Sequence, residues 1–122
     1  MTKAVRGAIQ VPENSVEAIT RASIRLVTEV LRVNELAENQ LVSILFSVTD
    51  DLTAASPATG LRTRGFAGTP LFCAQEARLD GGMPRVLRVL VTWDAPETRT
   101  TVPVYLDGAE SLRPDLGNGV NE

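Results

Sequence analysis

The chain has 122 residues, of which 43% are hydrophobic, and it carries a net charge of -3 at pH 7. This length and hydrophobic content suffice for one compact domain with a single core. Only 4% of the residues are aromatic, so a base-stacking platform has few rings to build from, and the negative charge disfavours binding to a phosphate backbone. A nucleic-acid partner is therefore not expected.

The absence of histidine and the near absence of cysteine exclude whole reaction classes. The sequence has no histidine and one cysteine, Cys73, which excludes imidazole general bases, Ser-His and Cys-His nucleophile pairs, and thiolate or imidazole zinc sites. One cysteine permits no intramolecular disulfide, and the sequence shows neither a signal-peptide pattern near Met1 nor a long apolar run. We therefore expect a cytoplasmic protein without a membrane segment.

The first predicted strand runs from Lys3 to Val11, with apolar residues on one face. Arg6 lies on the other face between two alanines, which leaves room above its side chain for a ligand. A solvated strand face is the alternative interpretation. Gly7 in the same strand indicates either a bulge or a close approach of another segment to the backbone.

A helix is predicted to follow Pro12 and to extend to about Asn34. Its start resembles a capping box, in which Asn14 accepts from the first helical N–H groups and Glu17 reaches back. Apolar side chains recur at spacings of three and four, which is typical of one stripe facing a core. The stripe contains Val16, Ile19, Ser23, Leu26, Val27, Val30 and Leu31.

The remaining predicted elements are four strands and one short helix. A central strand is expected at Leu41 to Val48, with an apolar face formed by Val42, Ile44, Phe46 and Val48. A short helix begins near Ser56-Pro57 and ends by Gly65. Three more strands are predicted at Pro70 to Ala74, Arg85 to Trp93 and Thr101 to Leu106. Pro103 cannot donate to a ladder, so the last strand is expected at an edge or at a bulge.

This order predicts an α+β fold in which the helices pack on one face of a mixed sheet. Residues 1–116 are expected to form one domain and residues 117–122 a flexible tail. A sheet in so small a chain leaves edges and part of one face uncovered, which favours a homo-oligomer over a monomer.

Several charged residues break the strand patterns. Arg88 lies mid-strand on the face of Val86 and Leu90, where a guanidinium is costly unless an anion meets it. Glu76 directly follows a strand, and the turn at Gly81, Gly82 and Pro84 is expected to bring Glu76 and Arg88 together.

Other polar residues extend this set, namely Arg6, Tyr105 on the polar face of the edge strand, and Arg62 or Arg113. For Arg62 the alternative is a capping role at the end of the short helix. Together with Glu76 and Arg88 these residues would bind a small dianion that bears a hydroxyl group. A pocket without a base that titrates near pH 7 favours a reaction that needs only geometry and electrostatics.

Six segments carry a family resemblance. They are similar to the motifs of the monofunctional chorismate mutases of the AroH type, the Bacillus-like class, in that family's order and at nearly its spacings over essentially the whole chain. The segments are Arg6-Gly7-Ala8, Thr49-Asp50-Asp51-Leu52, Cys73-Ala74-Gln75-Glu76, Gly82-Met83-Pro84-Arg85-Val86-Leu87-Arg88-Val89, Val104-Tyr105-Leu106 and Leu112-Arg113-Pro114-Asp115-Leu116.

The resemblance implies a homotrimer of small α+β, ferredoxin-like subunits whose sheets form a pseudo-α/β-barrel, with active sites between neighbouring subunits. It also implies that chorismate is rearranged to prephenate, in phenylalanine and tyrosine biosynthesis, by a pericyclic shift without cofactor or covalent intermediate. In this interpretation Arg88 donates to the ether oxygen whose bond breaks, and to a carboxylate. Glu76 accepts from the ring hydroxyl, with Cys73 beside it.

The resemblance assigns binding roles to four further residues. Arg6 would clamp a carboxylate, and Tyr105 would hydrogen-bond the side-chain carboxylate of the substrate. Arg62, from the short helix of the adjacent subunit, and Arg113, from the chain end that closes over the cleft, would complete the positive lining.

Two positions depart from the family pattern. Ser56 stands where the family commonly has an aromatic residue, and Thr59 where a basic residue is common. Their consequence would be weaker substrate binding, without an effect on the groups that meet the breaking bond.

Two other functions remain open at this point. An imine or enamine deaminase of the RidA type is also a small trimer with arginine at its clefts, although the segments ending at Glu76 and Asp115 speak against it. A non-catalytic oligomeric module that binds dicarboxylates is the other alternative.

Overall fold

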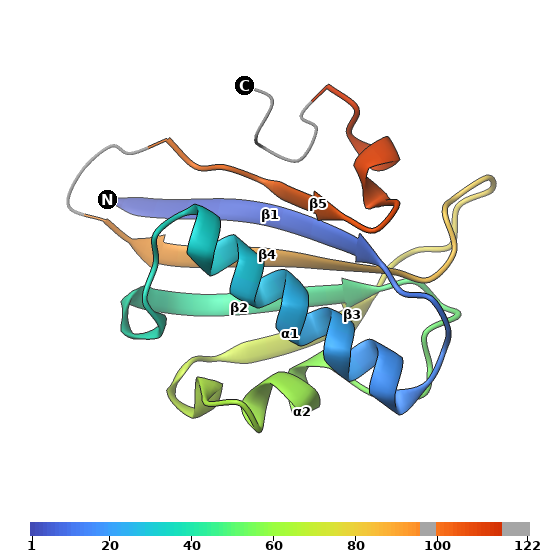
Figure 1. The fold of residues 1–122 in the computed structure, drawn as a ribbon, viewed down its shortest axis with the longest axis horizontal. Helices are drawn as coiled ribbons and strands as arrows, with labels where there is room; N and C mark the ends of the chain where they lie inside the picture. Colours follow the sequence, from blue (N-terminus) through green and yellow to red (C-terminus); the bar gives the residue numbers. More distant parts are fainter. Residues whose placement is uncertain (96–99, 116–122) are drawn as a thin grey trace.

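The computed structural model describes residues 1–95 and 100–115 of the chain. This part forms seven main elements, each close to its predicted position (Figure 1). In chain order they are β1 (Thr2–Gln10), α1 (Val16–Val33), β2 (Leu41–Val48), α2 (Pro57–Arg62), β3 (Leu71–Gln75), β4 (Val86–Asp94) and β5 (Val104–Leu106).

The strands form one mixed sheet in the order β3-β2-β4-β1-β5. Strand β4 is antiparallel to both of its neighbours, β1 and β2, whereas the outer pairs β2/β3 and β1/β5 are parallel. Both helices lie on the same side of the sheet, and they pack against each other (Figure 1). The predicted α+β class, the mixed sheet and the one-sided helix layer are therefore confirmed. We call the two sides of the sheet the covered face and the open face.

The main core lies between α1 and the covered face. The predicted helix stripe supplies Ile19, Leu26, Val27 and Val30, each fully buried. Burying a side chain of this size contributes roughly 1.5–3 kcal/mol relative to leaving it exposed. Val16 of the same stripe is largely exposed, because it is the first residue of the helix.

Gly7 lets β1 approach its neighbours closely. A Cβ atom at this position would lie 3.0 Å from the Val104 carbonyl oxygen and 3.2 Å from side-chain carbons of Leu26 and Val30. The pairing of β1 with β4 runs without a register shift, so the prediction of a close approach is confirmed and the alternative of a bulge is wrong.

The helix cap differs from the prediction. Ser15 is the N-cap of α1, and its hydroxyl accepts a hydrogen bond from the Ala18 N–H at 3.1 Å. Asn14 instead fastens the loop after β2, since its Oδ1 accepts from the N–H groups of Thr53 and Ala54 at 3.0 and 2.9 Å. Both residue types cap helices well, and only the path of the neighbouring loop distinguishes their roles.

Two strand details also differ. The register between β2 and β4 shifts between Leu41 and Ser43, so Val42 is the extra residue of a bulge and is exposed rather than part of the apolar face. Strand β5 begins at Val104 rather than at Thr101, and it lies at the sheet edge, so the prediction of an edge strand is confirmed.

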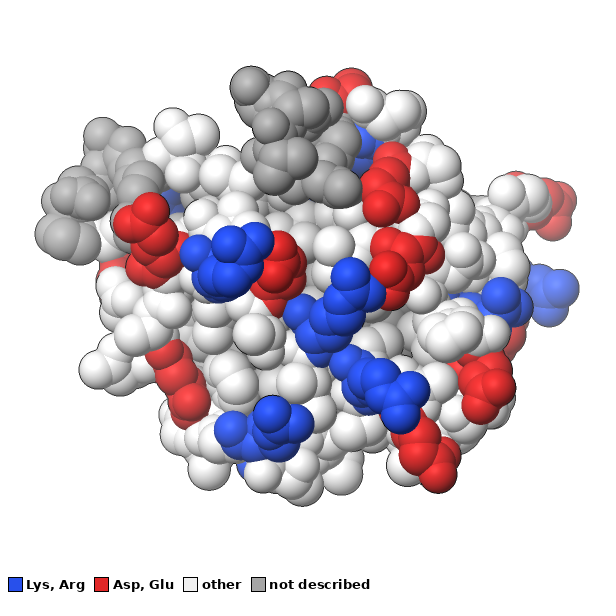
Figure 2. Space-filling model, in the orientation of Figure 1, with Lys and Arg blue, Asp and Glu red and all other residues white. Residues whose placement is uncertain are grey.

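The solvent side of the helix layer carries charges of both signs (Figure 2). Arg32 pairs with Glu29 on α1, and Arg25 of α1 pairs with Asp107 after β5. This face therefore presents a mixed, solvated surface, opposite the apolar stripe of α1.

None of the helices within residues 1–95 and 100–115 is long and apolar enough to span a bilayer. The predicted flexible tail, residues 117–122, lies outside the described residues.

Candidate active site

A line of side chains crosses the open face from one sheet edge to the other. The strand pairings align Tyr105 of β5 with Ala8 of β1, Arg88 of β4, Ser47 of β2 and Ala74 of β3. Partners in register project to the same side of a sheet. The mid-strand arginine is therefore at the centre of this line, on the side of the sheet opposite α1 and α2.

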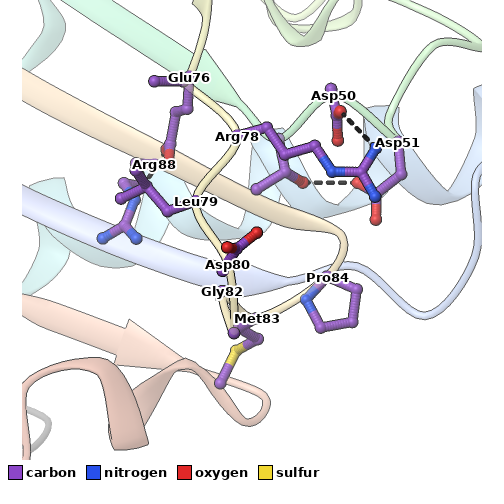
Figure 3. A pocket seen from close by; sticks show the side chains of 13 residues that line it. Asp50, Asp51, Glu76, Arg78, Leu79, Asp80, Gly82, Met83, Pro84 and Arg88 are labelled. Carbon is purple, nitrogen blue, oxygen red and sulfur yellow. Dashed lines mark hydrogen bonds and ion pairs between the residues drawn. The ribbon is translucent and has the colours of Figure 1, made fainter.

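Arg88 meets an anion that belongs to its own chain. The Nε of Arg88 donates to Oε2 of Glu76 at 2.7 Å, and the Ser47 hydroxyl donates to the same oxygen at 2.6 Å. The Glu76 backbone N–H donates to the Val48 carbonyl at 2.8 Å, which extends the β2/β3 pairing by one residue and places the carboxylate over β2. Figure 3 shows the Glu76 side chain pointing toward the Arg88 guanidinium.

The turn at Gly81, Gly82 and Pro84 was predicted to bring Glu76 and Arg88 together, and this prediction is wrong about the cause. Strands β3 and β4 are not neighbours, because β2 lies between them. The segment from Ala77 to Arg85 passes the end of β2 to reach β4. The side chains of Glu76 and Arg88 meet across β2, next to Ser47, and the order of the strands brings them together.

The loop after β2 fixes the start of β4. Asp51 accepts from the Arg85 N–H with both carboxylate oxygens, at 3.1 and 3.0 Å, and from the Thr49 hydroxyl at 2.6 Å. Thr49 Oγ1 also accepts from the Val86 N–H at 3.0 Å. Arg85 has a positive φ of 52°, a conformation that costs a non-glycine residue free energy unless its surroundings hold it. This clamp lies three residues from Arg88.

The pKa of Asp51 reflects these contacts. Burial by itself raises the pKa, but hydrogen bonds from the Thr49 hydroxyl and from the N–H groups of Arg85 and Asp51, together with the charge of Arg85, lower it overall. Asp51 therefore stays ionised to a lower pH than an ordinary aspartate does.

Two cavities meet at Arg88. The first, which we call the loop cavity, has a volume of about 380 Å³ and is lined by Glu76, by residues 77–84 and by Thr49 to Asp51 (Figure 3). Arg78 lies on its rim and pairs with Asp50 at 3.5 Å. The second, which we call the sheet cavity, has a volume of about 340 Å³ and lies on the open face.

The sheet cavity contains two of the predicted binding residues, Arg6 and Tyr105, beside Arg88. Arg6 is exposed, and Tyr105 is 2% exposed, which corrects the expectation that it lies on a polar strand face. Tyr105 is buried because the segment after β5 covers it. Tyr105 thus belongs to a hydrophobic cluster that is smaller than the main core and separate from it. The cluster consists of Ala8, Val86, Tyr105 and Ala109, with Met83 and Leu112 packed against it.

Arg113 lies at the same end of the sheet. It pairs with Asp115 at 3.0 Å. The hydrogen bond to Asp115 raises the pKa of Arg113, with a smaller contribution from Tyr105. The pKa of Asp115 is lowered, mainly by Arg113 and to a small extent by Arg6. The chain end thus brings a third arginine near Arg6 and Tyr105.

Arg62 and Cys73 are not brought to this line within one chain. Cys73 pairs in register with Phe46 of the main core and packs on the covered face. Arg62 is the last residue of α2 and is exposed. Ser56 caps α2 and also contacts Cys73: burial raises the pKa of the Cys73 thiol, and a hydrogen bond with Ser56 opposes that rise in part. Ser56 and Cys73 thus lie together at the β3 edge.

The sequence interpretation missed Ser47 and Asp51 as parts of the site. Ser47 interrupts an apolar strand on the same face as Arg88, and Asp51 belongs to one of the six family-like segments, so both carried a signal. Within residues 1–95 and 100–115 the structure holds no group of three or more His, Cys, Asp or Glu side chains suited to bind a metal ion.

Comparisons with known proteins agree with one another. The family model described as chorismate mutase type I matches residues 2–116. A chorismate mutase AroH from Thermus thermophilus is 42% identical over 119 residues, which covers 95% of this chain and 97% of that protein. The chorismate mutase AroH of Bacillus subtilis (strain 168) is 33% identical over 119 residues, 95% of this chain and 93% of that protein.

A solved structure supports the same assignment. A chorismate mutase from Clostridium thermocellum superposes with a TM-score of 0.85 at 34% identity, over 89% of this chain and 98% of that one. Sequence and fold therefore lead to one conclusion, which is that the chain belongs to the chorismate mutase type I family.

Proposed function

We propose that this protein is a chorismate mutase, which rearranges chorismate to prephenate at a site built around Arg88. One carbon–oxygen bond of the substrate breaks while a carbon–carbon bond forms, so the reaction needs neither a nucleophile nor an external base. The observation that carries the proposal is the alignment of Arg88, Glu76 and Tyr105 on the open face of a chain that matches the family over residues 2–116.

Arg88 and Glu76 act on the reacting part of the substrate. Arg88 donates to the ether oxygen as negative charge grows on it, and to a substrate carboxylate. A donor already held in place stabilises a developing charge without reorganisation at the moment of reaction. Glu76 accepts from the ring hydroxyl and so holds the ring in the reactive conformer.

Arg6, Tyr105 and Arg113 bind the carboxylates. Arg6 and Tyr105 line the sheet cavity on one side of Arg88, while Glu76 lies with Arg88 in the loop cavity on the other side. Within the described part of the chain, the buried Tyr105 hydroxyl has no hydrogen-bond partner, which leaves it available to a substrate carboxylate. Arg113 exchanges its Asp115 partner for the substrate when the site is filled.

The site is completed by a neighbouring subunit of a homotrimer. Leu45, Phe72 and Leu90 lie in register across three strands of the open face and are 44%, 64% and 42% exposed. A contiguous apolar patch of this kind is typical of an interface. A second copy that covers it places its own β3 edge, with Arg62 and Cys73, against the cavities of the first copy.

The direct test is incubation of the purified protein with chorismate while prephenate is measured. Formation of prephenate at a rate well above the uncatalysed one is expected. The match over residues 2–116 favours this activity over the deaminase alternative. A rise in melting temperature with chorismate, without any product, would instead support the non-catalytic module.

Mixed oligomers test whether the site is shared. Arg88→Ala and Arg62→Ala chains are each expected to have low activity as pure proteins. When the two chains are co-expressed in equal amounts, random assembly leaves about a quarter of the inter-subunit sites with both arginines. Activity should therefore recover to about that fraction of wild type, and sedimentation should give the mass of a trimer. No recovery from a mixed trimer would contradict the shared site.

A further inference from the structure

Ser47 holds the acidic residue of the site, and no role has so far been assigned to it. It lies in the middle of the line across the open face, paired in register with Arg88 on one side and with Ala74 on the other. Its hydroxyl donates to Oε2 of Glu76 at 2.6 Å, a length typical of a strong hydrogen bond to a carboxylate.

Two donors therefore converge on one oxygen of Glu76. Arg88 Nε reaches the same Oε2 at 2.7 Å, so this oxygen is engaged within the protein. Among the described residues, neither the other oxygen, Oε1, nor the terminal nitrogens of Arg88 form a hydrogen bond. The atoms left unpaired are thus one carboxylate acceptor and the outer guanidinium donors, and both residues line the loop cavity.

We propose that Ser47 is a positioning residue, which fixes Glu76 so that Oε1 faces the substrate hydroxyl while the outer N–H groups of Arg88 remain available to the substrate. This inference rests on the proposed function and goes beyond it. Ser47 itself does not contact the reacting atoms.

The physical need for such a residue follows from the flexibility of glutamate. Its side chain has three rotatable bonds, and ordering it costs conformational entropy. With Arg88 as the only donor, the carboxylate is free to turn and to take the outer guanidinium N–H groups that the substrate requires. Ser47 prevents this because it belongs to a strand that is paired on both sides.

The fold itself does not need a hydroxyl group at position 47. Leu45 occupies the same face of β2 two residues earlier, so an apolar side chain is compatible with this face. Ser43, on the same face of the strand, is also partly buried, but it pairs with Thr92 and lies away from Glu76. It provides a matched control for the loss of a serine hydroxyl from this strand.

The test compares kcat/KM for chorismate in Ser47→Ala, Ser47→Thr and Ser43→Ala chains, after melting temperatures have shown that each is folded. Loss of a hydrogen bond to a charged group changes the equilibrium constant of the interaction by a factor of about ten to a hundred. We therefore expect kcat/KM of Ser47→Ala to fall by about that factor. Ser47→Thr, which retains a hydroxyl, should regain most of the activity, and Ser43→Ala should match wild type.

A double-mutant cycle separates positioning from a general structural effect. If Ser47 acts through Glu76, adding Ser47→Ala to Glu76→Ala should cause no further loss of kcat/KM. Independent, multiplicative losses would overturn the proposal, as would full activity of Ser47→Ala. An inactive wild-type protein would overturn the proposed function together with this inference, whereas an active wild type with multiplicative losses would overturn the inference alone.

Discussion

The two faces of the sheet differ in how deeply the side chains of β4 are buried. On the covered face of β4, Leu87, Val89 and Val91 are 0%, 3% and 0% exposed and belong to the core. On the open face of the same strand, Arg88 and Leu90 stay partly accessible. Alternation lets neighbouring residues serve stability and function separately. A substitution on one face should therefore change the free energy of unfolding, and one on the other face should change catalysis or assembly.

The largest expected effect is on the open face. Arg88→Ala should lower kcat by at least about two orders of magnitude, because the loss of a preorganised donor typically costs roughly 3 kcal/mol or more. Its melting temperature and its oligomer mass should stay close to wild type. Arg78→Ala is the control, since Arg78 is 83% exposed at the rim of the loop cavity. Nearly normal turnover of Arg88→Ala would refute its assigned role.

A smaller effect of a different kind is expected on the covered face. Val91→Ala removes two buried carbon atoms and should lower the free energy of unfolding by about 2 kcal/mol through lost burial and a residual cavity. Below its melting transition the variant should retain near-normal kcat. Denaturant unfolding and an assay at low temperature measure the two quantities. A large loss of kcat without a loss of stability would show that the two faces are not independent.

The smallest effect is expected for a predicted binding residue that lies on the covered face rather than on the open face. Cys73 was predicted as a binding residue, yet it packs on the covered face. Burial raises the pKa of its thiol, so the neutral form dominates near pH 7 and no thiolate is available. Cys73→Ala should therefore reduce kcat/KM only slightly and leave its pH profile unchanged between pH 6 and about 8. A shifted profile would show that the thiol ionises in the working site.

Local patterns predicted much of the fold. The period of α1 identified its buried stripe, and alternation in β4 placed Arg88 on the face of Val86 and Leu90. These predictions succeeded because helix and strand periodicity depend on residues a few positions apart. The cap at Ser15 and the bulge at Val42 were not predicted, since Asn14 is drawn away from the helix by its bonds to the distant Thr53 and Ala54, and the bulge depends on pairing with β4.

The sequence by itself determined which residues are available for chemistry, a set of arginines and one carboxylate without histidine, and which face of each strand they occupy. Only the tertiary structure decided that β2 lies between β3 and β4, and thus that Ser47 meets both Glu76 and Arg88. It also decided that Cys73 packs on the covered face and that Arg62 ends α2, so that neither joins this line within one chain. Strand order follows from pairing between distant segments, which no local period encodes.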